Sequence, residues 1–173
     1  MTEVSRIGES EWDVWRSFYA MRRRLDHALE VQLQRDSGIS RPDFEILIAL
    51  FNAPDRRLRV RELISTIGWE KSRVSHQVTR MEKRGLVTKF ECDSDRRGSW
   101  VELTSTGRKV ILGAMREHSD TIKRYFFDAL SPDELAVIGT ASASIISAIE
   151  PTPCDASLAL DNVEPAGSST VAE

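Results

Sequence analysis

Apolar positions recur along most of this chain with a period close to 3.6 residues, which predicts amphipathic helices. Residues 10 to about 36 are expected to form a long helix that Ser37 and Gly38 end. Its apolar side is supplied by Trp12, Trp15, Phe18 or Tyr19, Leu25, Leu29 and Leu33. Ser40 and Asp43 then have the spacing of a capping box, and they predict a second helix whose apolar residues run from Phe44 to Phe51.

The segment after the second helix begins with polar residues. Pro54–Arg57 is predicted to be a polar turn, and Val60 is expected to form a very short strand. Glu62–Ile67 is expected to form the next helix, with Leu63, Ile64 and Ile67 facing inward.

The following short helix has two contrasting faces. Val74, Val78 and Met81 lie at i, i+4 and i+7, so they share an apolar side, and Gly85 follows in the place of a C-cap glycine. At about 100° per residue the opposite side collects Ser72, Arg73, His76, Thr79, Arg80 and Lys83, none of them acidic. Such side chains can bind base edges in a major groove or phosphates. The alternative is a solvated basic face on an ordinary surface helix.

A β-hairpin is predicted directly after this helix. Leu86–Cys92 and Ser99–Thr104 carry β-branched and aromatic residues, and turn-forming residues separate them. Arg96 and Arg97 are expected at the hairpin tip, where adjacent guanidiniums suit a narrow, electronegative minor groove. Asp95 is close enough in sequence to orient one of them. The alternative is a polar tip that charge keeps soluble, but a hairpin placed straight after a groove-shaped helix is more specific for DNA than either part.

Two more helices and a tail are predicted after the hairpin. Thr104 or Ser105 can cap a long helix that runs to about Ala129. Ser131–Glu134 is a second capping box with Pro at the first helical position. The helix that it starts has the apolar residues Leu135, Ile138, Ile145, Ile146 and Ile149. From residue 151 the chain contains no Lys or Arg and is rich in Pro, Ser, Gly, Ala and acids, which predicts a disordered acidic tail over residues 151–173.

The hairpin carries a spaced signature: Asp, any residue, Arg, five residues, Leu-Thr, and Gly three residues after the Thr. In order these are Asp95, Arg97, Leu103, Thr104 and Gly107. The region resembles the MarR family of bacterial winged helix-turn-helix regulators. Ser72, Val74, Val78, Met81 and Gly85-Leu86-Val87 also match that family's usual recognition-helix pattern. The resemblance extends more loosely over residues 10–149, and it implies that Arg97 enters the minor groove, fixed by a salt bridge to Asp95.

A net charge of −3 is unfavourable for binding DNA, but the charge is unevenly divided along the chain. From Arg56 to Arg97 there are twelve Lys or Arg and six Asp or Glu, so this middle carries +6 and the remainder −9. A basic middle between acidic ends is expected of a local DNA-facing patch.

The aromatic residues outside the basic middle favour a homodimer. They are Trp12, Trp15, Phe18, Tyr19, Phe126 and Phe127. A compact winged helix cannot bury this much apolar surface, whereas a second copy could, placing two recognition helices one DNA turn apart, about 34 Å. The resemblance implies the same arrangement, with dimerisation through the first and last helices and a pseudo-palindromic operator. The alternative is a larger monomeric helical domain.

Ligand, metal and redox sites have weaker support. The resemblance implies small aromatic or organic effectors, and Trp12, Trp15, Tyr19, Arg22 and Phe44 could line a pocket, although a dimer core explains the same residues more simply. Trp69 is expected to be a packing anchor. Cys92 is expected to be an inert strand thiol rather than a redox sensor. His27, His76 and His118 are scattered, so no metal and no cofactor are predicted.

No catalytic motif was found: the chain lacks a Gly-rich phosphate loop, HExxH and GxSxG, and Ser75 and His76 are helix neighbours that do not face one another. No signal peptide or long apolar run occurs, so a cytoplasmic protein without membrane association is expected.

Together these patterns predict a mainly α protein with a small β-wing. Residues 1–150 form one MarR-like domain, with dimerisation helices at 10–36 and 105–149 and the winged helix-turn-helix at 40–104. The predicted function is that of a DNA-binding transcriptional regulator, a homodimeric repressor of nearby genes with a small aromatic or organic effector as a further partner; the alternative is a winged-helix module that binds proteins. The predicted double-stranded DNA contacts are Lys71, Ser72, Arg73, Ser75, His76, Gln77, Thr79, Arg80, Lys83, Asp95, Arg96 and Arg97.

Overall fold

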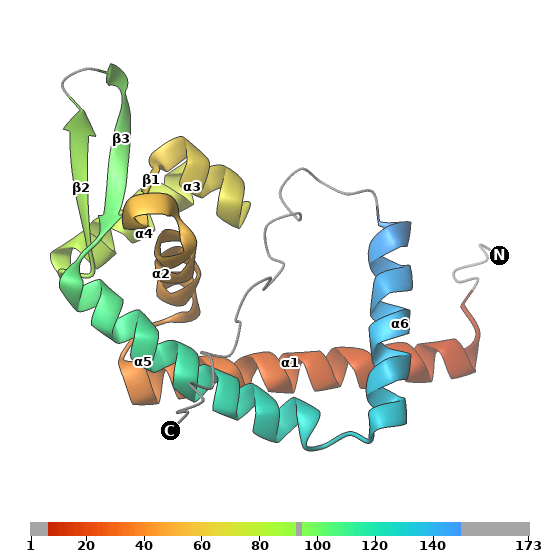
Figure 1. Ribbon diagram of the computed structural model, residues 1–173. Helices are drawn as coiled ribbons and strands as arrows, with labels where there is room; N and C mark the ends of the chain where they lie inside the picture. The colour runs from red at the N-terminus through yellow and green to blue at the C-terminus, as the bar shows by residue number, and fades with distance from the viewer. Residues whose placement is uncertain (1–6, 93–94, 150–173) are drawn as a thin grey trace, which may run out of the picture.

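The computed structural model describes residues 7–92 and 95–149, with the backbone alone at residues 91, 92 and 95–98. The chain is mostly helical with one small antiparallel sheet, as the sequence predicts (Figure 1). The elements are α1 (Glu9–Ser37), α2 (Arg41–Asn52), η1 (Pro54–Arg56), β1 (Arg57–Arg59), α3 (Val60–Ile67), α4 (Lys71–Lys83), β2 (Val87–Cys92), β3 (Asp95–Leu103), α5 (Ser105–Ile122), a π-helical turn η2 (Lys123–Phe127) and α6 (Pro132–Ala148).

The helix boundaries follow from the local chemistry that the sequence indicated. Gly38 ends α1 in the left-handed conformation, with φ +64°. Both capping boxes form: the N–H of Asp43 donates to the hydroxyl of Ser40 (3.3 Å), and that of Glu134 donates to the hydroxyl of Ser131 (3.3 Å). Each side-chain bond satisfies a donor that the first helical turn would otherwise leave unpaired.

Several boundaries differ from the sequence prediction, and helix α5 ends at Ile122 rather than near Ala129, with the π-helical turn η2 after it. Val60 is not a strand residue but the first residue of α3, because the N–H of Arg59 donates to the carboxylate of Glu62 (2.9 Å) and a helix start follows. The short strand β1 precedes it and pairs with β3, which is the central strand of the order β1-β3-β2. Strand β3 begins at Asp95 rather than Ser99, because it continues to pair with β2 beyond an irregularity at Glu91 and Cys92.

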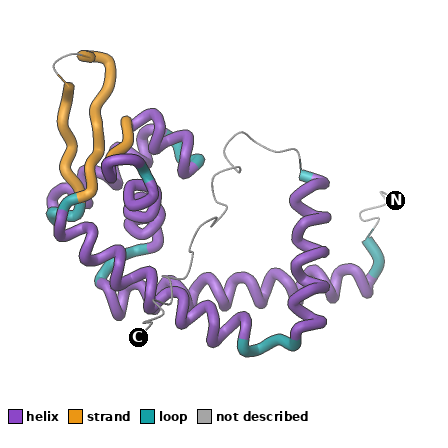
Figure 2. The backbone as a smooth tube through the Cα atoms, viewed as in Figure 1, coloured by secondary structure: helices purple, strands orange, loops and turns teal. Residues whose placement is uncertain are grey.

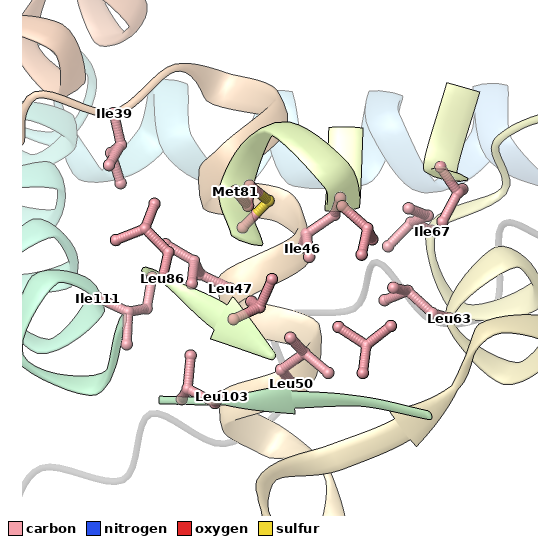
Figure 3. Close-up of a cluster of buried hydrophobic side chains, with 14 of the residues drawn as sticks. Ile39, Ile46, Leu47, Leu50, Leu63, Ile67, Met81, Leu86, Leu103 and Ile111 are labelled. Carbon is pink, nitrogen blue, oxygen red and sulfur yellow. The ribbon is translucent and has the colours of Figure 1, made fainter. Parts of the chain in front are cut away.

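We call residues 39–104 the head and the helices α1, α5, η2 and α6 the stalk. The head holds most of the core, in which side chains from α2, α3, α4 and the sheet meet (Figure 3). Of the described core residues, the stalk contributes only Leu33, Ile111 and Ala114. In Figures 1 and 2 the stalk helices extend away from the head, and α6 stands across α1 at the far end.

Head and stalk meet at a small polar junction. Nδ1 of His118 in α5 donates to Oε1 of Gln32 in α1 (3.1 Å), and the His118 ring packs on Phe44 of α2 with centroids 4.8 Å apart. Arg41 of α2 also donates to Asp26 of α1 (3.2 Å). Burial, and then the nearby Arg41 charge, lower the pKa of His118, so its neutral form is favoured.

Within the described ranges, no helix has the length and apolar character needed to cross a bilayer.

Candidate nucleic-acid interface

Helices α3 and α4 form a helix-turn-helix, joined by the three residues Gly68 to Glu70. Gly68 has a φ of +67°, and its N–H donates to the carbonyl of Ile64 (3.0 Å). That left-handed conformation suits glycine and allows the chain to turn sharply between the helices. Helix α4 then starts without a side-chain cap and with Lys71 rather than an acid in its first turn. A cation at the positive end of a helix does not favour the free helix, but it strengthens that end's attraction for an anion.

The two faces of α4 are those that the sequence predicts. Val74, Val78 and Met81 are buried in the head. The candidate contacts on the opposite side are exposed, and they are Lys71, Ser72, Arg73, Ser75, His76, Thr79, Arg80 and Lys83. The structure therefore gathers eight candidate residues, none of them acidic, on one solvent-facing side of one helix.

Gln77 lies elsewhere, which corrects its expected place on the contact surface. Its side chain is only 8 % exposed, and Nε2 donates to Oδ1 of Asp43 in α2 (2.6 Å). The reason is its spacing: Gln77 lies three residues after Val74 and four before Met81, within the inward-facing stripe. A phosphate could reach this amide only if the side chain left its buried position beside Asp43.

Asp43 is the buried partner of several groups. It is 2 % exposed, and Oδ2 accepts from the N–H of Ser40 (2.9 Å), the hydroxyl of Ser40 (2.9 Å) and the guanidinium of Arg84 (2.7 Å). Burial raises the pKa of Asp43, but the hydrogen bonds from Ser40 and Arg84 and the Arg84 charge outweigh it. The pKa therefore lies below its ordinary value, and the carboxylate is ionised at neutral pH.

Two exposed residues of α4 also have internal contacts. The guanidinium of Arg73 lies 3.8 Å from the centroid of the Trp69 ring, a cation–π contact that restricts where the side chain points. Trp69 is half-buried against the core, which confirms its predicted packing role. The hydroxyl of Thr79 donates to the carbonyl of Ser75 (2.9 Å), so Thr79 offers chiefly its methyl group and an acceptor oxygen.

The end of α4 explains why the Leu-Thr-x-x-Gly part of the signature has its spacing. The N–H of Leu86 donates to the carbonyl of Met81 (3.0 Å) across the left-handed Gly85, which is the Schellman arrangement. Thr104 Oγ1 lies 2.7 Å from the Gly85 carbonyl oxygen and accepts from the N–H of Gly107 (2.9 Å), so one side chain joins α4 to α5. A Cβ at Gly107 would lie 2.1 Å from the Leu86 carbonyl oxygen, so no other residue fits there without a shift.

The remaining candidate contacts lie in the wing, which is the hairpin of β2 and β3. The backbones of Asp95, Arg96 and Arg97 belong to strand β3, so the arginines lie in the strand rather than in the loop that the sequence predicted. Their side chains, and that of Cys92, lie outside the described part of the structure. The expected salt bridge from Asp95 to Arg97 therefore remains a prediction.

Strand β1 carries two arginines that the sequence interpretation did not assign to a strand: Arg57 was predicted to lie in a polar turn, and Arg59 was counted but given no position. The guanidiniums of Arg57 and Arg59 lie 5.3 and 5.0 Å from the Trp100 ring centroid, on one face of the sheet. Their i, i+2 spacing could have indicated a shared strand face, had the strand been placed at 57–59. Trp100 on β3 holds this pair next to the wing.

The residues considered for an effector pocket do not come together. Trp15 stacks on Tyr19 with ring centroids 6.4 Å apart, whereas Phe44 packs on His118 at the other end of α1. A different pocket of about 540 Å³ lies between α1, η2 with the turn that follows it, and α6. It is lined by Met21, Arg24, Leu25, Ala28, Tyr125, Phe126, Ala129, Leu130 and Ile138.

The fold and this basic α4 surface define a winged helix-turn-helix protein. The sequence profile of the MarR family matches residues 37–98. Two solved structures of MarR family transcriptional regulators from Streptomyces coelicolor are similar over nearly the whole chain. One is Sco3205, solved in complex with DNA, at 33 % identity and TM-score 0.77 over 90 % of this chain and 97 % of that one. The other is AbsC, at 34 % identity and TM-score 0.75 over 84 % of this chain and 97 % of that one. The chain belongs to the MarR family.

A more distant relative agrees with this assignment. The HTH-type transcriptional repressor YetL of Bacillus subtilis (strain 168) is 25 % identical over 137 residues, which span 73 % of this chain and 81 % of the relative. The chain is therefore a DNA-binding transcriptional regulator, as the sequence predicted.

Proposed function

We propose that the chain is a homodimeric repressor that binds a pseudo-palindromic operator in double-stranded DNA near its own gene. The observation that carries the proposal is the exposed side of α4, where eight cationic or hydrogen-bonding residues lie together. The exposed acid of this helix, Glu82, accepts from the backbone N–H of Lys89 in β2 (3.0 Å). Repression is the role of the relative YetL, and we extend it to this chain.

The contacts divide by chemistry. Ser72, Arg73, His76 and Arg80 of α4 contact base edges in the major groove, because their side chains can donate to purine acceptors. Lys71 and Lys83 contact phosphates and set the register of the helix on the duplex.

Ser75 and Thr79 complete the surface of α4 between the base-contacting residues. Arg96 and Arg97 act in the minor groove with Asp95 orienting Arg97. Gln77 is left out of the proposed contacts because Asp43 already holds its amide.

The dimer is formed by the stalk. Helix α6 has no buried residue, and Ile145 is 56 % exposed. Near the start of α1, Trp15 and Tyr19 are each 54 % exposed. A monomer gains little from ordering such apolar helices, whereas a second copy of the same stalk would bury them. Two α4 helices would then meet one face of the DNA about 34 Å apart.

A small aromatic or organic effector releases the operator in this proposal. The pocket of about 540 Å³ combines the aromatic rings of Tyr125 and Phe126 with the cationic Arg24, a lining suited to an aromatic carboxylate. Benzoate added to the protein–DNA complex tests this part: it should raise the melting temperature of the free protein and release the DNA. An unchanged melting temperature and an intact complex with benzoate would count against a carboxylate effector at this pocket.

The first experiment is fluorescence anisotropy of the purified full chain on DNA from upstream of its own gene. Scrambled DNA of equal length is the control, and both are measured at two salt concentrations. Selective binding of one dimer per site, with a log–log salt slope near −0.9 per phosphate contact, is the expected result. Equal binding to both DNAs would contradict the operator, and absence of binding would favour a protein-docking role.

A further inference from the structure

Asp43 does more than cap the helix in which it lies. Four helices in the described part of the chain start with a carboxylate that accepts from the N-cap N–H, and two of these, at Ser40 and Ser131, are complete capping boxes. At the starts of α1 and α6 the carboxylates of Glu11 and Glu134 are exposed. Those two bind only their own cap in the contacts described. The carboxylate of Asp43 is 2 % exposed, and two side chains from the recognition helix and its C-cap also bind it. Capping alone does not require burial or these partners.

Gln77 is the first of those partners. It occupies an inward position among Val74, Val78 and Met81, where an apolar side chain would pack at no cost in polar desolvation. A buried amide is tolerated there because Asp43 accepts its hydrogen bond (2.6 Å). Hydrophobic contacts are non-directional, whereas this bond fixes one rotation of α4 about its own axis.

Arg84 is the second partner and lies at the C-cap of α4. Its guanidinium donates to Oδ2 of Asp43 (2.7 Å) and to the carbonyl oxygen of Gly38 (2.7 Å), which is the corner between α1 and α2. Gln77 and Arg84 are seven residues apart, about two turns or 10 Å along the helix. Two attachments at that separation, both to one carboxylate, restrict the sliding of α4 as well as its rotation.

We propose that Asp43, Gln77 and Arg84 form a positioning clamp that sets the orientation of α4, so that its exposed side chains meet the base edges of the operator. The proposal rests on the sequence-specific DNA binding proposed above. Base recognition tolerates only small errors in the placement of a helix, of order 10–20° in angle. Phosphate contacts tolerate more, because they depend chiefly on charge. Loss of a contact within the clamp should therefore lower the affinity for the operator more than the affinity for DNA of unrelated sequence.

The test uses the full chain with Gln77→Met, which keeps the length of the side chain and removes its donor. Affinities for the upstream DNA and for scrambled DNA are measured at one salt concentration, with urea unfolding in parallel. We expect affinity for the upstream DNA to fall about tenfold or more, with affinity for scrambled DNA within about twofold of wild type. Glu134→Gln, which weakens an exposed capping box in α6, is the matched control and should leave the ratio of the two affinities unchanged.

Arg84→Lys provides a second variant if Gln77→Met does not fold. Lysine keeps the positive charge, so attraction to scrambled DNA is preserved, but it cannot fork between Asp43 and the Gly38 carbonyl. The affinity ratio is again expected to fall. A lower urea midpoint with an unchanged ratio would reduce the clamp to a stability element and overturn the proposal. An equal loss on both DNAs with a shallower salt slope would instead make the residue a phosphate contact. A wild-type protein that does not distinguish the two DNAs would refute the proposed operator binding, which is a separate result.

Discussion

The head buries its large apolar side chains, whereas the stalk leaves many of its own exposed to solvent. In the head, Leu47, Leu50 and Leu63 are completely buried, and each contributes to a core shared by helices and sheet. In the stalk, Trp15, Ile145 and Ile146 remain largely exposed although they lie in well-formed helices. The head is thus stable through contacts within one chain, whereas the stalk has apolar surface that one chain does not cover.

This difference separates two kinds of stability. Unfolding of the head should depend on its own packing and not on protein concentration. The ordering of the stalk should depend on concentration, because an association equilibrium contributes to it in the proposed dimer. Mutations in the two regions should therefore differ in the size of their effect on stability and in whether that effect depends on protein concentration.

The largest effect is expected in the stalk from Ile145→Ser. Burying one isoleucine contributes about 1.5–3 kcal/mol, and a symmetric dimer contains the residue twice, so association should weaken by about 3–6 kcal/mol. Sedimentation of the variant at micromolar concentration should show monomers. Lys89→Ser, at an exposed position of β2, is the control and should remain dimeric. Dimers of unchanged affinity in the Ile145 variant would remove α6 from the interface.

The head counterpart is Leu50→Ala, which leaves a cavity in a fully buried site. The free energy of unfolding should fall by about 2–5 kcal/mol, measured by urea unfolding. The loss should be the same at low and high protein concentration, because the site lies inside one chain. A loss that varies with concentration would contradict the separation of the two regions.

Gly107→Ala acts where the head joins the stalk. The added Cβ would lie 2.1 Å from the backbone oxygen of Leu86, so the start of α5 must shift. A destabilisation of about 1–3 kcal/mol is expected in urea unfolding. Gly113→Ala in the same helix is the control: nothing lies within 4 Å of its added Cβ, so higher helix propensity should stabilise it by up to about 1 kcal/mol.

Arg97→Ala tests the predicted minor-groove contact of the wing. Loss of a minor-groove contact should cost about 1–3 kcal/mol of operator binding, with unfolding and sedimentation as in wild type. Anisotropy titration on the upstream DNA measures it. Near-wild-type affinity would refute the assignment of Arg97 to the minor groove.

The smallest effect is expected from the junction residue His118. Because its pKa is lowered in the folded chain, the unfolded chain binds more protons, and stability falls as pH drops below about 6.5 toward the folded pKa. The stability is fully present above that range. His118→Gln should remove this part of the pH dependence, under about 1 kcal/mol because solvent screens the half-buried ring. Urea midpoints at about pH 7.5 and 5.5 compare the two proteins, and equal pH dependence would exclude His118 as the source.

Local chemistry made the helices predictable. Ser40, Ser131 and Gly85 each determine a helix end through bonds to residues within a few positions, so their spacing alone was sufficient. The start of the second wing strand was harder to predict from the sequence. Strand β3 extends to Asp95 because it pairs with β2, and no residue near Asp95 indicates that pairing.

The candidate site was predictable to the extent that it depends on one helix. The period of α4 separated its exposed from its buried face, but Gln77 was misplaced because its polar side chain suggested the outer face. Its partner Asp43 lies 34 residues earlier in the chain. Sequence spacing has no access to a contact of that range, and only the packing of α2 against α4 brings the two side chains together.

The length of α1 has a mechanical consequence. Its 29 residues extend about 44 Å at about 1.5 Å per residue. Its fully buried residues, Gln32 and Leu33, lie in its last turns, and Leu25, Ala28 and Leu29 are half-buried. Trp12 lies 21 residues before Leu33, about 32 Å from this fulcrum. A tilt of about 10° there displaces the far end by about 5–6 Å by simple geometry. In such a tilt the bonds from Arg41 to Asp26 and from His118 to Gln32 would lie near the fixed end of α1.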